Sequence, residues 1–314
     1  MTEEDQKNKA IDSAENLIKQ GKYKEAIALL KQLRETSPEE DSVLFMMALA
    51  YYDSGDTEQA EKYFNELFEK ELKRKVFTGF AFDELVRIYK KEQQFRKLVE
   101  ICEKAVAVQP EDVGLLTELG NAYLESGRAE KACEIYTRLI GMENDNPAFY
   151  CGLGEALFAG GLMKESEKAF IKAGEIDADQ SDHYYFKIAV LFQKNGNHEE
   201  AKRLLKKCIF LSSANPLYYC SLGDSFIGLG QIEKALEAYE TAARSDEVRA
   251  GAYFNRLGHS LMKANNFEQA VKAFDSAIKK DPLRPYYLGL AQAYKGMGLT
   301  KEAQRIHNAV DKKA

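Results

Sequence analysis

Residues 147–174 read PAFYCGLGEALFAGGLMKESEKAFIKAG, and their apolar residues recur at the period of an α-helix on both sides of a glycine pair. The pattern consists of Tyr150, Leu153, Gly154 and Leu157, then Gly160 and Gly161, then Ala169, Phe170 and Ala173. Such spacing predicts two amphipathic helices. The glycines predict a tight turn between them, because glycine takes the left-handed backbone that ends a helix without a side-chain clash.

The same pattern occurs nine times along the 314 residues. A small residue of the first helix lies at Ala14, Ala48, Val86, Gly120, Gly154, Ala189, Gly223, Gly258 and Ala291, mostly 33 to 35 residues apart. A second small residue follows twelve positions later, at Ala26, Ala60, Leu98, Ala132, Ser166, Ala201, Ala235, Ala270 and Ala303. We expect repeats that start near residues 7, 41, 79, 113, 147, 182, 216, 251 and 284.

The period and the paired small positions closely resemble the tetratricopeptide repeat (TPR) family, whose unit is a helix-turn-helix of 34 residues. The resemblance implies an all-α protein, a right-handed superhelical α-solenoid of nine helix-turn-helix repeats. It implies a single solenoid over residues 7–314, preceded by a flexible N-terminus at residues 1–6, and it favours a bacterial member of the family.

Composition limits the function. The chain is 45% hydrophobic and 30% charged with a net charge of −6, which argues against disorder and against nucleic acid as a partner. It has no apolar run of membrane-spanning length, and its start, MTEEDQKNKA, lacks the apolar core of a signal peptide. We therefore predict a cytoplasmic protein that has no membrane partner.

Nothing in the sequence indicates catalysis. The five cysteines are scattered and form no C-x-x-C pair, and the four histidines are dispersed, so neither a disulfide framework nor a zinc site is indicated. Glycine-rich phosphate loops and nucleophile elbows are absent. We predict that the protein is not an enzyme and holds no cofactor and no metal.

The third repeat departs from the pattern. The spacing before it is 38, its small positions are Val86 and Leu98, and Gln93 replaces the turn glycine. Residues 70–97 contain nine Lys or Arg and four Asp or Glu. A coherent positive surface steers an acidic partner, so this repeat is either a hinge or a docking site for an acidic segment. Alternatively, its charges form ordinary exposed pairs, such as Asp83 with Arg87.

The family resemblance implies that the first helix of each repeat lines a concave groove that binds a partner. The predicted partner-binding residues are Phe45, Leu49, Tyr52, Arg87, Lys90, Lys91, Asn121, Phe158, Phe186, Asn255 and His259. We expect Phe45, Tyr52, Phe158 and Phe186 to anchor the partner, the alternative being that these rings pack against the neighbouring repeat. Family members that grip a chaperone carboxylate pair a lysine with an asparagine, but Thr117 stands where Asn121 would need its lysine.

Three functions remain. The first is a non-enzymatic protein–protein interaction scaffold that binds a peptide or partner segment in the groove. The second is a self-assembling structural protein, a homo-oligomer formed end to end or by docking an N-terminal segment in a neighbour's groove. The third is RNA or anionic-surface binding through the basic third repeat.

Overall fold

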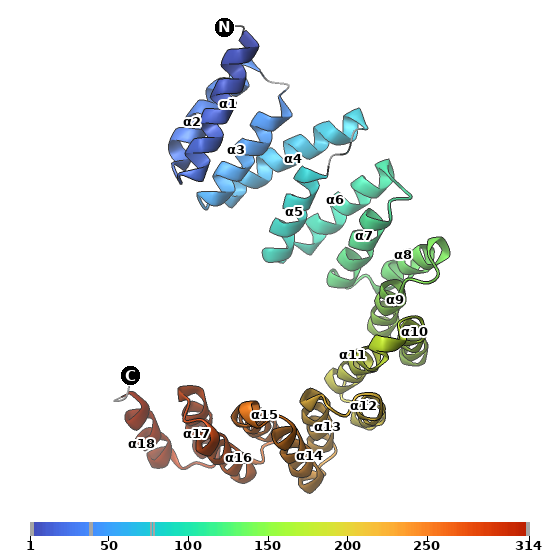
Figure 1. Ribbon diagram of the computed structural model, residues 1–314, viewed down its shortest axis with the longest axis vertical. Helices are drawn as coiled ribbons and strands as arrows, with labels where there is room; N and C mark the ends of the chain where they lie inside the picture. Colours follow the sequence, from blue (N-terminus) through green and yellow to red (C-terminus); the bar gives the residue numbers. More distant parts are fainter. Residues whose placement is uncertain (1–2, 38–39, 76, 78, 312–314) are drawn as a thin grey trace. The chain divides into compact units, whose positions relative to one another are not determined.

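A computed structural model describes residues 3–37, 40–75, 77 and 79–311, and all regular elements within them are helical (Figure 1). The predicted all-α solenoid is confirmed. Met1 and Thr2 of the predicted flexible N-terminus, and Pro38, lie outside the described residues. The chain forms two compact units, Met1–Met142 and Glu143–Ala314, and each is described by itself.

Unit 1 is a series of helical hairpins in which each helix packs against the helix before it. Its helices are α1 (Glu3–Lys19), α2 (Tyr23–Thr36), α3 (Asp41–Asp53), α4 (Thr57–Arg74), α5 (Phe80–Lys91), α6 (Phe95–Val108), α7 (Val113–Glu125) and α8 (Ala129–Met142). The odd-numbered helices are the first helices of their repeats.

Unit 2 continues the same hairpin pattern, and here the first helices α9, α11, α13, α15 and α17 also contact one another in order. They therefore form a row along one side of the unit. The helices are α9 (Pro147–Ala159), α10 (Met163–Ile176), α11 (Ser181–Lys194), α12 (His198–Leu211), α13 (Pro216–Gly228), α14 (Ile232–Ser245), α15 (Ala250–Lys263), α16 (Phe267–Lys280), α17 (Arg284–Gly296) and α18 (Thr300–Asp311). Two short 3₁₀ turns, η1 (Ala178–Gln180) and η2 (Glu247–Arg249), precede α11 and α15.

The turn inside each hairpin depends on one residue with left-handed backbone. In the fifth repeat this residue is Gly161, with φ +81° and no atom within 4 Å of the position a Cβ would take. Gln93 and Asn265 hold the same conformation in the third and eighth repeats, with φ of 56° and 57°. The Gln94 amide donates to the Tyr89 carbonyl over 2.8 Å, as the corresponding amides do in the glycine turns. Replacement of the turn glycine by Gln93 or Asn265 thus keeps the turn geometry and adds backbone strain at that residue.

The two helices of a hairpin approach closely where the first one lacks a side chain. A Cβ at Gly154 would lie 2.7 Å from the Phe170 ring, and one at Gly223 would lie 2.5 Å from the Tyr239 ring. Phe170 and Tyr239 are buried, so each ring fills the space that the glycine leaves open. Close-packed interiors of this kind tolerate no added methyl without movement.

The long spacing before the third repeat is explained by α4 and by one aromatic residue. Helix α4 has 18 residues, against 14 in α2, and ends at Lys75, whose φ is 54°. After it, the Phe77 ring packs between Phe68 and Phe82, with centroid distances of 6.1 and 5.5 Å. The extra residues therefore lengthen a helix and add a half-buried ring that packs on the core of unit 1. Leu98, at a small-residue position, is fully buried.

Replacing Gln93 with glycine should stabilise unit 1. A left-handed backbone costs an L-residue about 1–2 kcal/mol that glycine does not pay, so we expect Gln93→Gly to raise the midpoint of urea unfolding. Asn265→Gly should give a smaller gain, because asparagine tolerates this conformation. Gln59→Gly, inside α4, is the control and should lower the midpoint. A lower midpoint for Gln93→Gly would contradict the strain inferred at this turn.

Candidate functional site

In unit 1 the structure brings three of the predicted partner-binding residues together. The Arg87 guanidinium lies 4.3 Å from the centroid of the Tyr52 ring, and the Lys91 ammonium lies 5.3 Å from it. Lys91 also donates to the Tyr52 hydroxyl over 3.2 Å. Cations on the face of an aromatic ring attract it electrostatically. Tyr52, Arg87 and Lys91 therefore form one patch of side chains from α3 and α5, the Tyr52 patch.

The other predicted residues of unit 1 have partners within the unit. Phe45 is half-buried and contacts Phe64 and Phe80, with centroid distances of 5.8 and 6.0 Å. Asn121 accepts a 2.6 Å hydrogen bond from the Tyr136 hydroxyl. Leu49 is half-buried. These contacts agree with the packing alternative for Phe45 and occupy the carbonyl oxygen of Asn121.

Carboxylates from several helices form ion pairs with the basic side chains of residues 70–97. Arg87 donates to Glu84 over 2.8 Å, and not to Asp83 as expected. Lys90 lies 2.5 Å from Glu118, Lys97 lies 2.6 Å from Glu61, and Arg74 lies 2.6 Å from Asp41. Pairs as exposed as these contribute about 0–1 kcal/mol each to stability. Their main effect is to reduce the positive field that the local sequence predicts.

Asp83 itself is not paired with Arg87. It lines a pocket of about 600 Å³ between α5 and α7 together with Glu118. Burial, and then the charges of Glu84 and Glu118, raise the pKa of Asp83 above its usual value. The first helix of the third repeat thus carries negative groups beside its positive ones.

In unit 2 the predicted aromatic anchors pack against neighbouring repeats. The Phe158 ring is 5.5 Å from Phe192 in an edge-to-face arrangement, and the Phe186 ring is 5.0 Å from Tyr218. Both Phe158 and Phe186 are partly buried against the core of the unit. Each ring is therefore only partly available to another molecule.

The two predicted polar residues of α15 differ in environment. His259 is exposed and lies 5.1 Å from the Phe274 ring. Burial, and then the charge of Lys263, lower the pKa of His259, so its imidazole is mostly neutral at pH 7. The Asn255 side-chain oxygen is buried and has no hydrogen-bond partner within the described residues.

A polar cluster around Asp224 was missed as a candidate site. Asp224 Oδ1 accepts from the Tyr239 and Ser260 hydroxyls, each over 2.6 Å, and Oδ2 accepts from Arg256 Nη2 over 2.6 Å. Arg256 also donates to the Ser221 hydroxyl over 3.1 Å. We call these five residues the Asp224 cluster. The sequence signal for it was an acidic residue, Asp224, on the first helix of the seventh repeat and an arginine, Arg256, on the first helix of the eighth.

Electrostatics fix the ionisation of this cluster. Burial is the largest single influence on the pKa of Arg256 and lowers it, but the charge and hydrogen bond of Asp224, with Tyr239 and Cys220, together raise the pKa above its usual value. Burial, and then the charge of Asp224, raise the pKa of Tyr239. Tyr239 therefore stays a protonated donor and Arg256 a cation at neutral pH. The carboxylate of Asp224 is saturated by donors, so it has no free lone pair with which to act as a base.

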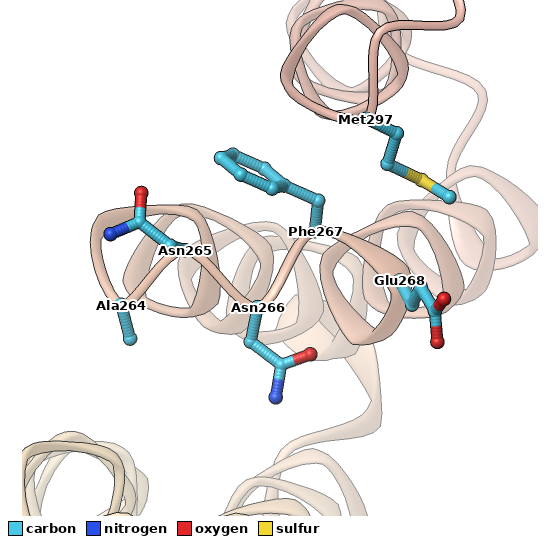
Figure 2. Close-up of a pocket in the computed structure, with 6 residues that line it drawn as sticks. All are labelled: Ala264, Asn265, Asn266, Phe267, Glu268 and Met297. Atoms are coloured by element: carbon cyan, nitrogen blue, oxygen red, sulfur yellow. The ribbon is translucent and has the colours of Figure 1, made fainter.

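A second pocket lies at the turns of the last two hairpins (Figure 2). Its volume is about 560 Å³, and its lining residues are Ala264, Asn265, Asn266, Phe267, Glu268 and Met297. In Figure 2 the polar ends of Asn265, Asn266 and Glu268 lie apart from one another. A ligand site needs polar groups that converge, and this pocket offers none.

Metal-binding clusters and membrane-spanning helices are both absent from the part of the chain that the structure describes. Residues 3–37, 40–75, 77 and 79–311 contain no group of three or more His, Cys, Asp or Glu side chains placed to hold a metal ion. Over the same residues, the helices are too short or too polar to cross a membrane.

Comparisons with known proteins agree with this fold. Three family models of the tetratricopeptide repeat match residues 17–76, residues 117–183 and 255–296, and residues 182–215 and 217–248, which together make up most of the chain. The chain belongs to the tetratricopeptide repeat family. TPR arrays are protein–protein interaction scaffolds, and the resemblance seen in the sequence is confirmed.

Individual TPR relatives are distant. The chain is 24% identical to the TPR repeat-containing protein MJ1428 of Methanocaldococcus jannaschii over 74% of its length, and 25% identical to the TPR repeat-containing protein YpiA of Bacillus subtilis over 74%. It covers 43% and 54% of those proteins, about half of their length. The crystal structure of a tetratricopeptide repeat protein from Parabacteroides merdae matches 83% of this chain and 98% of that one, with a TM-score of 0.54 and 18% identity.

The cysteines of this TPR protein are packing residues. Cys102, Cys151, Cys208 and Cys220 are buried, Cys133 is half-buried, and all five are free thiols. Burial raises the pKa of Cys208 and of Cys220 to about 12. Because the thiolate is the nucleophile, a raised pKa leaves almost none of it at neutral pH.

Alkylation should therefore distinguish Cys133 from the rest. With iodoacetamide at pH 7.5, we expect Cys133 to react first and the four buried cysteines to react at least about tenfold more slowly, since both access and thiolate fraction control the rate. Peptide mass spectrometry at timed intervals measures this. Cys133→Ser should remove the fast phase, and urea should make all the remaining cysteines reactive. Rapid labelling of Cys220 in the folded protein would contradict its burial.

Proposed function

We propose that this TPR protein is a non-enzymatic scaffold that binds a segment of a partner protein on the faces of its first helices. The observation that carries the proposal is the row of first helices in unit 2, whose polar side chains are already fixed by bonds within the row. Gln193, for example, donates to the Ser221 carbonyl over 2.6 Å and to the Ser225 hydroxyl over 2.8 Å. Side chains that are fixed before binding lose less entropy when a partner arrives.

In unit 1 the Tyr52 patch supports the same proposal. Tyrosine and arginine are enriched among residues that dominate binding energy, and here the ring of Tyr52 holds Arg87 in place. A partner carboxylate would meet Arg87 and Lys91, and its apolar neighbours would meet the exposed part of Leu49. The ion pairs with Glu84, Glu118 and Glu61 disfavour RNA, because a phosphate backbone requires a coherent positive surface.

The chemistry of the described side chains favours binding over catalysis. The buried thiols are protonated, and the Asp224 carboxylate has donors on both of its oxygens. Nucleophilic or general-base catalysis needs a group that is free to accept a proton or to attack. A scaffold that positions other proteins requires neither.

Charge reversal of the unit 1 patch tests the proposal. We expect wild-type protein to capture a partner from its native host, and Arg87→Glu with Lys90→Glu and Lys91→Glu to recover about tenfold less of it, since reversed charges repel a partner selected by attraction. Lys24→Glu with Lys62→Glu and Arg96→Glu, on second helices, is the matched control. Quantitative mass spectrometry of the captured proteins gives the ratio. If the two triple variants recover equal amounts of the partner, the patch does not bind it.

Self-association is a second candidate function, favoured by exposed apolar residues at the ends of second helices and between repeats of unit 2. Phe210 is 87% exposed and Val248 is 88% exposed. Apolar residues this exposed mark interaction surfaces when they gather. If self-association is the function, further copies of the chain cover Phe210 and Val248, and the protein acts by assembling.

Light scattering across a concentration range tests self-association. We expect the mass of the wild type to rise with concentration, and Phe210→Ser with Val248→Ser to keep the mass of a monomer, because the apolar contact is lost. Leu162→Ser is the control, because it also replaces an exposed apolar residue with serine but at a hairpin turn. It should behave as the wild type. A wild-type mass that stays at one chain throughout would exclude assembly.

A further inference from the structure

Three helices of unit 2 bring positively charged or imidazole side chains to one pocket. The pocket has a volume of about 600 Å³, and its lining residues are Gln193, Lys194, His198, Asp224, Ile227, Gly228, Ser260, Lys263 and Ala264. Lys194 ends α11, His198 begins α12 and Lys263 ends α15. The residues at this pocket are therefore supplied by the sixth, seventh and eighth repeats.

The negative groups around the pocket are already compensated. Arg256 neutralises Asp224 at 2.6 Å. The two carboxylates in the first turn of α12 are also engaged, Glu199 with Lys202 at 2.5 Å and Glu200 with Arg203 at 2.8 Å. Within the part of the chain that the structure describes, Lys194 and Lys263 have no ion-pair partner. The pocket therefore keeps an excess of positive charge.

His198 occupies a position with a structural role in other repeats. A Cβ at Gly228 would lie 2.3 Å from the His198 ring, just as a Cβ at Gly296 would lie 2.3 Å from the Phe267 ring. The two rings pack in the same way against the end of the next first helix. His198 differs in that its Nδ1 is buried without a hydrogen-bond partner among the described residues. A ligand cannot reach this buried nitrogen, so what His198 offers the pocket that it lines is the rest of its ring, including Nε2.

We propose that this pocket binds a carboxylate side chain of a partner protein, held by Lys194, Lys263 and His198. The inference rests on the proposed function and deepens it, because it names the chemistry of one part of the partner. The two ammonium groups supply the charge, and the His198 ring, which lines the same pocket, can add a hydrogen bond from Nε2. The position of each lysine at a helix end is favourable in any case, but that preference does not explain why two helix ends converge on one pocket.

A carboxylate fits this pocket better than a phosphate does. The floor presents the oxygens of Asp224 and Ser260, and the Ser260 hydroxyl already donates to Asp224 over 2.6 Å. Neither residue has a donor left for a ligand, so the available donors are those of Lys194, Lys263 and His198, which suit the two oxygens of a carboxylate better than the three acceptor oxygens of a phosphate dianion. Ile227 and Ala264 add apolar surface for the methylene groups of a glutamate.

Binding of short labelled peptides tests the inference directly. The probe is fluorescein-labelled hexaglutamate, the matched peptide is hexaglutamine, and fluorescence anisotropy reports the dissociation constant. We expect the full chain to bind hexaglutamate more tightly than hexaglutamine. Lys194→Glu with Lys263→Glu should weaken hexaglutamate binding about tenfold, since two attractive charges become repulsive.

Matched variants separate this pocket from general charge effects. Lys164→Glu with Lys168→Glu, exposed on α10, makes the same change in net charge and should weaken binding no more than about twofold. His198→Phe restores the side chain used at Phe267, keeps the packing, and should weaken binding about threefold. Phe267→His, the reciprocal change, should leave binding unaltered. Unfolding midpoints confirm that each variant is folded.

Several outcomes would overturn the inference. They are equal weakening by the two lysine double variants, equal affinity for the two peptides, and displacement of hexaglutamate by inorganic phosphate at concentrations near the peptide's own dissociation constant. The last result would assign the pocket to free phosphate. Hexaglutamate binding that depends on Lys194 and Lys263, in a protein that captures no partner from its host, would contradict the proposed function and leave the pocket's chemistry established.

Discussion

The structure of each unit depends on how closely the two helices of a hairpin approach. In unit 2 this distance is set by a ring that fills the space beside a glycine, as Phe170 does at Gly154, Tyr239 at Gly223 and Phe274 at Gly258. The ring replaces water with dispersion contacts on all sides. It also fixes the spacing of the first helices, because each hairpin packs on the next. The residues that reach the row of first helices are therefore positioned by contacts made beneath it.

The sequence predicted this arrangement well because its cause is periodic. Small residues, turn glycines and apolar stripes recur in most repeats, so the same local pattern predicts each hairpin in turn. The third repeat shows where the rule leaves the structure open. Gln93 holds the same turn as a glycine would, and the additional residues before Gly79 form a longer α4 and place the half-buried Phe77 ring against Phe82 of the core. A lengthened helix and a disrupted one produce the same gap in the spacing, so the pattern alone could not separate them.

The side-chain partners at the surface were much harder to predict. Tyr52, Arg87 and Lys91 lie together, and helical spacing alone already puts them on the facing sides of two successive first helices. The ion pairs of Lys97 with Glu61 and of Lys90 with Glu118 join different helices, and long side chains reach such partners only when the packing of both helices is known. Likewise, the tilted contact of Phe186 with Tyr218 depends on the angle between two repeats, and residue spacing does not give this angle.

The Asp224 cluster links helices of two repeats through hydrogen bonds, whereas the rest of the unit relies on apolar packing. Two hydroxyls and a guanidinium converge on one carboxylate, and a buried network of this kind is stable only when every member is satisfied. The cluster therefore specifies one register between α13, α14 and α15. Its cost is that the carboxylate is unavailable to any other molecule, which leaves the neighbouring lysines as the charged groups that a partner would meet.

In a repeat protein each repeat contacts only its neighbours, so a change of side chain at one position affects only the adjacent repeats. The start of the second helix illustrates this freedom. Phe267 and His198 fill the same space against Gly296 and Gly228, yet one presents only carbon and the other presents nitrogen. Because the packing is equivalent, the fold does not determine which of the two is used. The choice between phenylalanine and histidine must therefore be determined by something outside the hairpin. A group on another molecule that accepts a hydrogen bond from the imidazole is sufficient to explain the histidine.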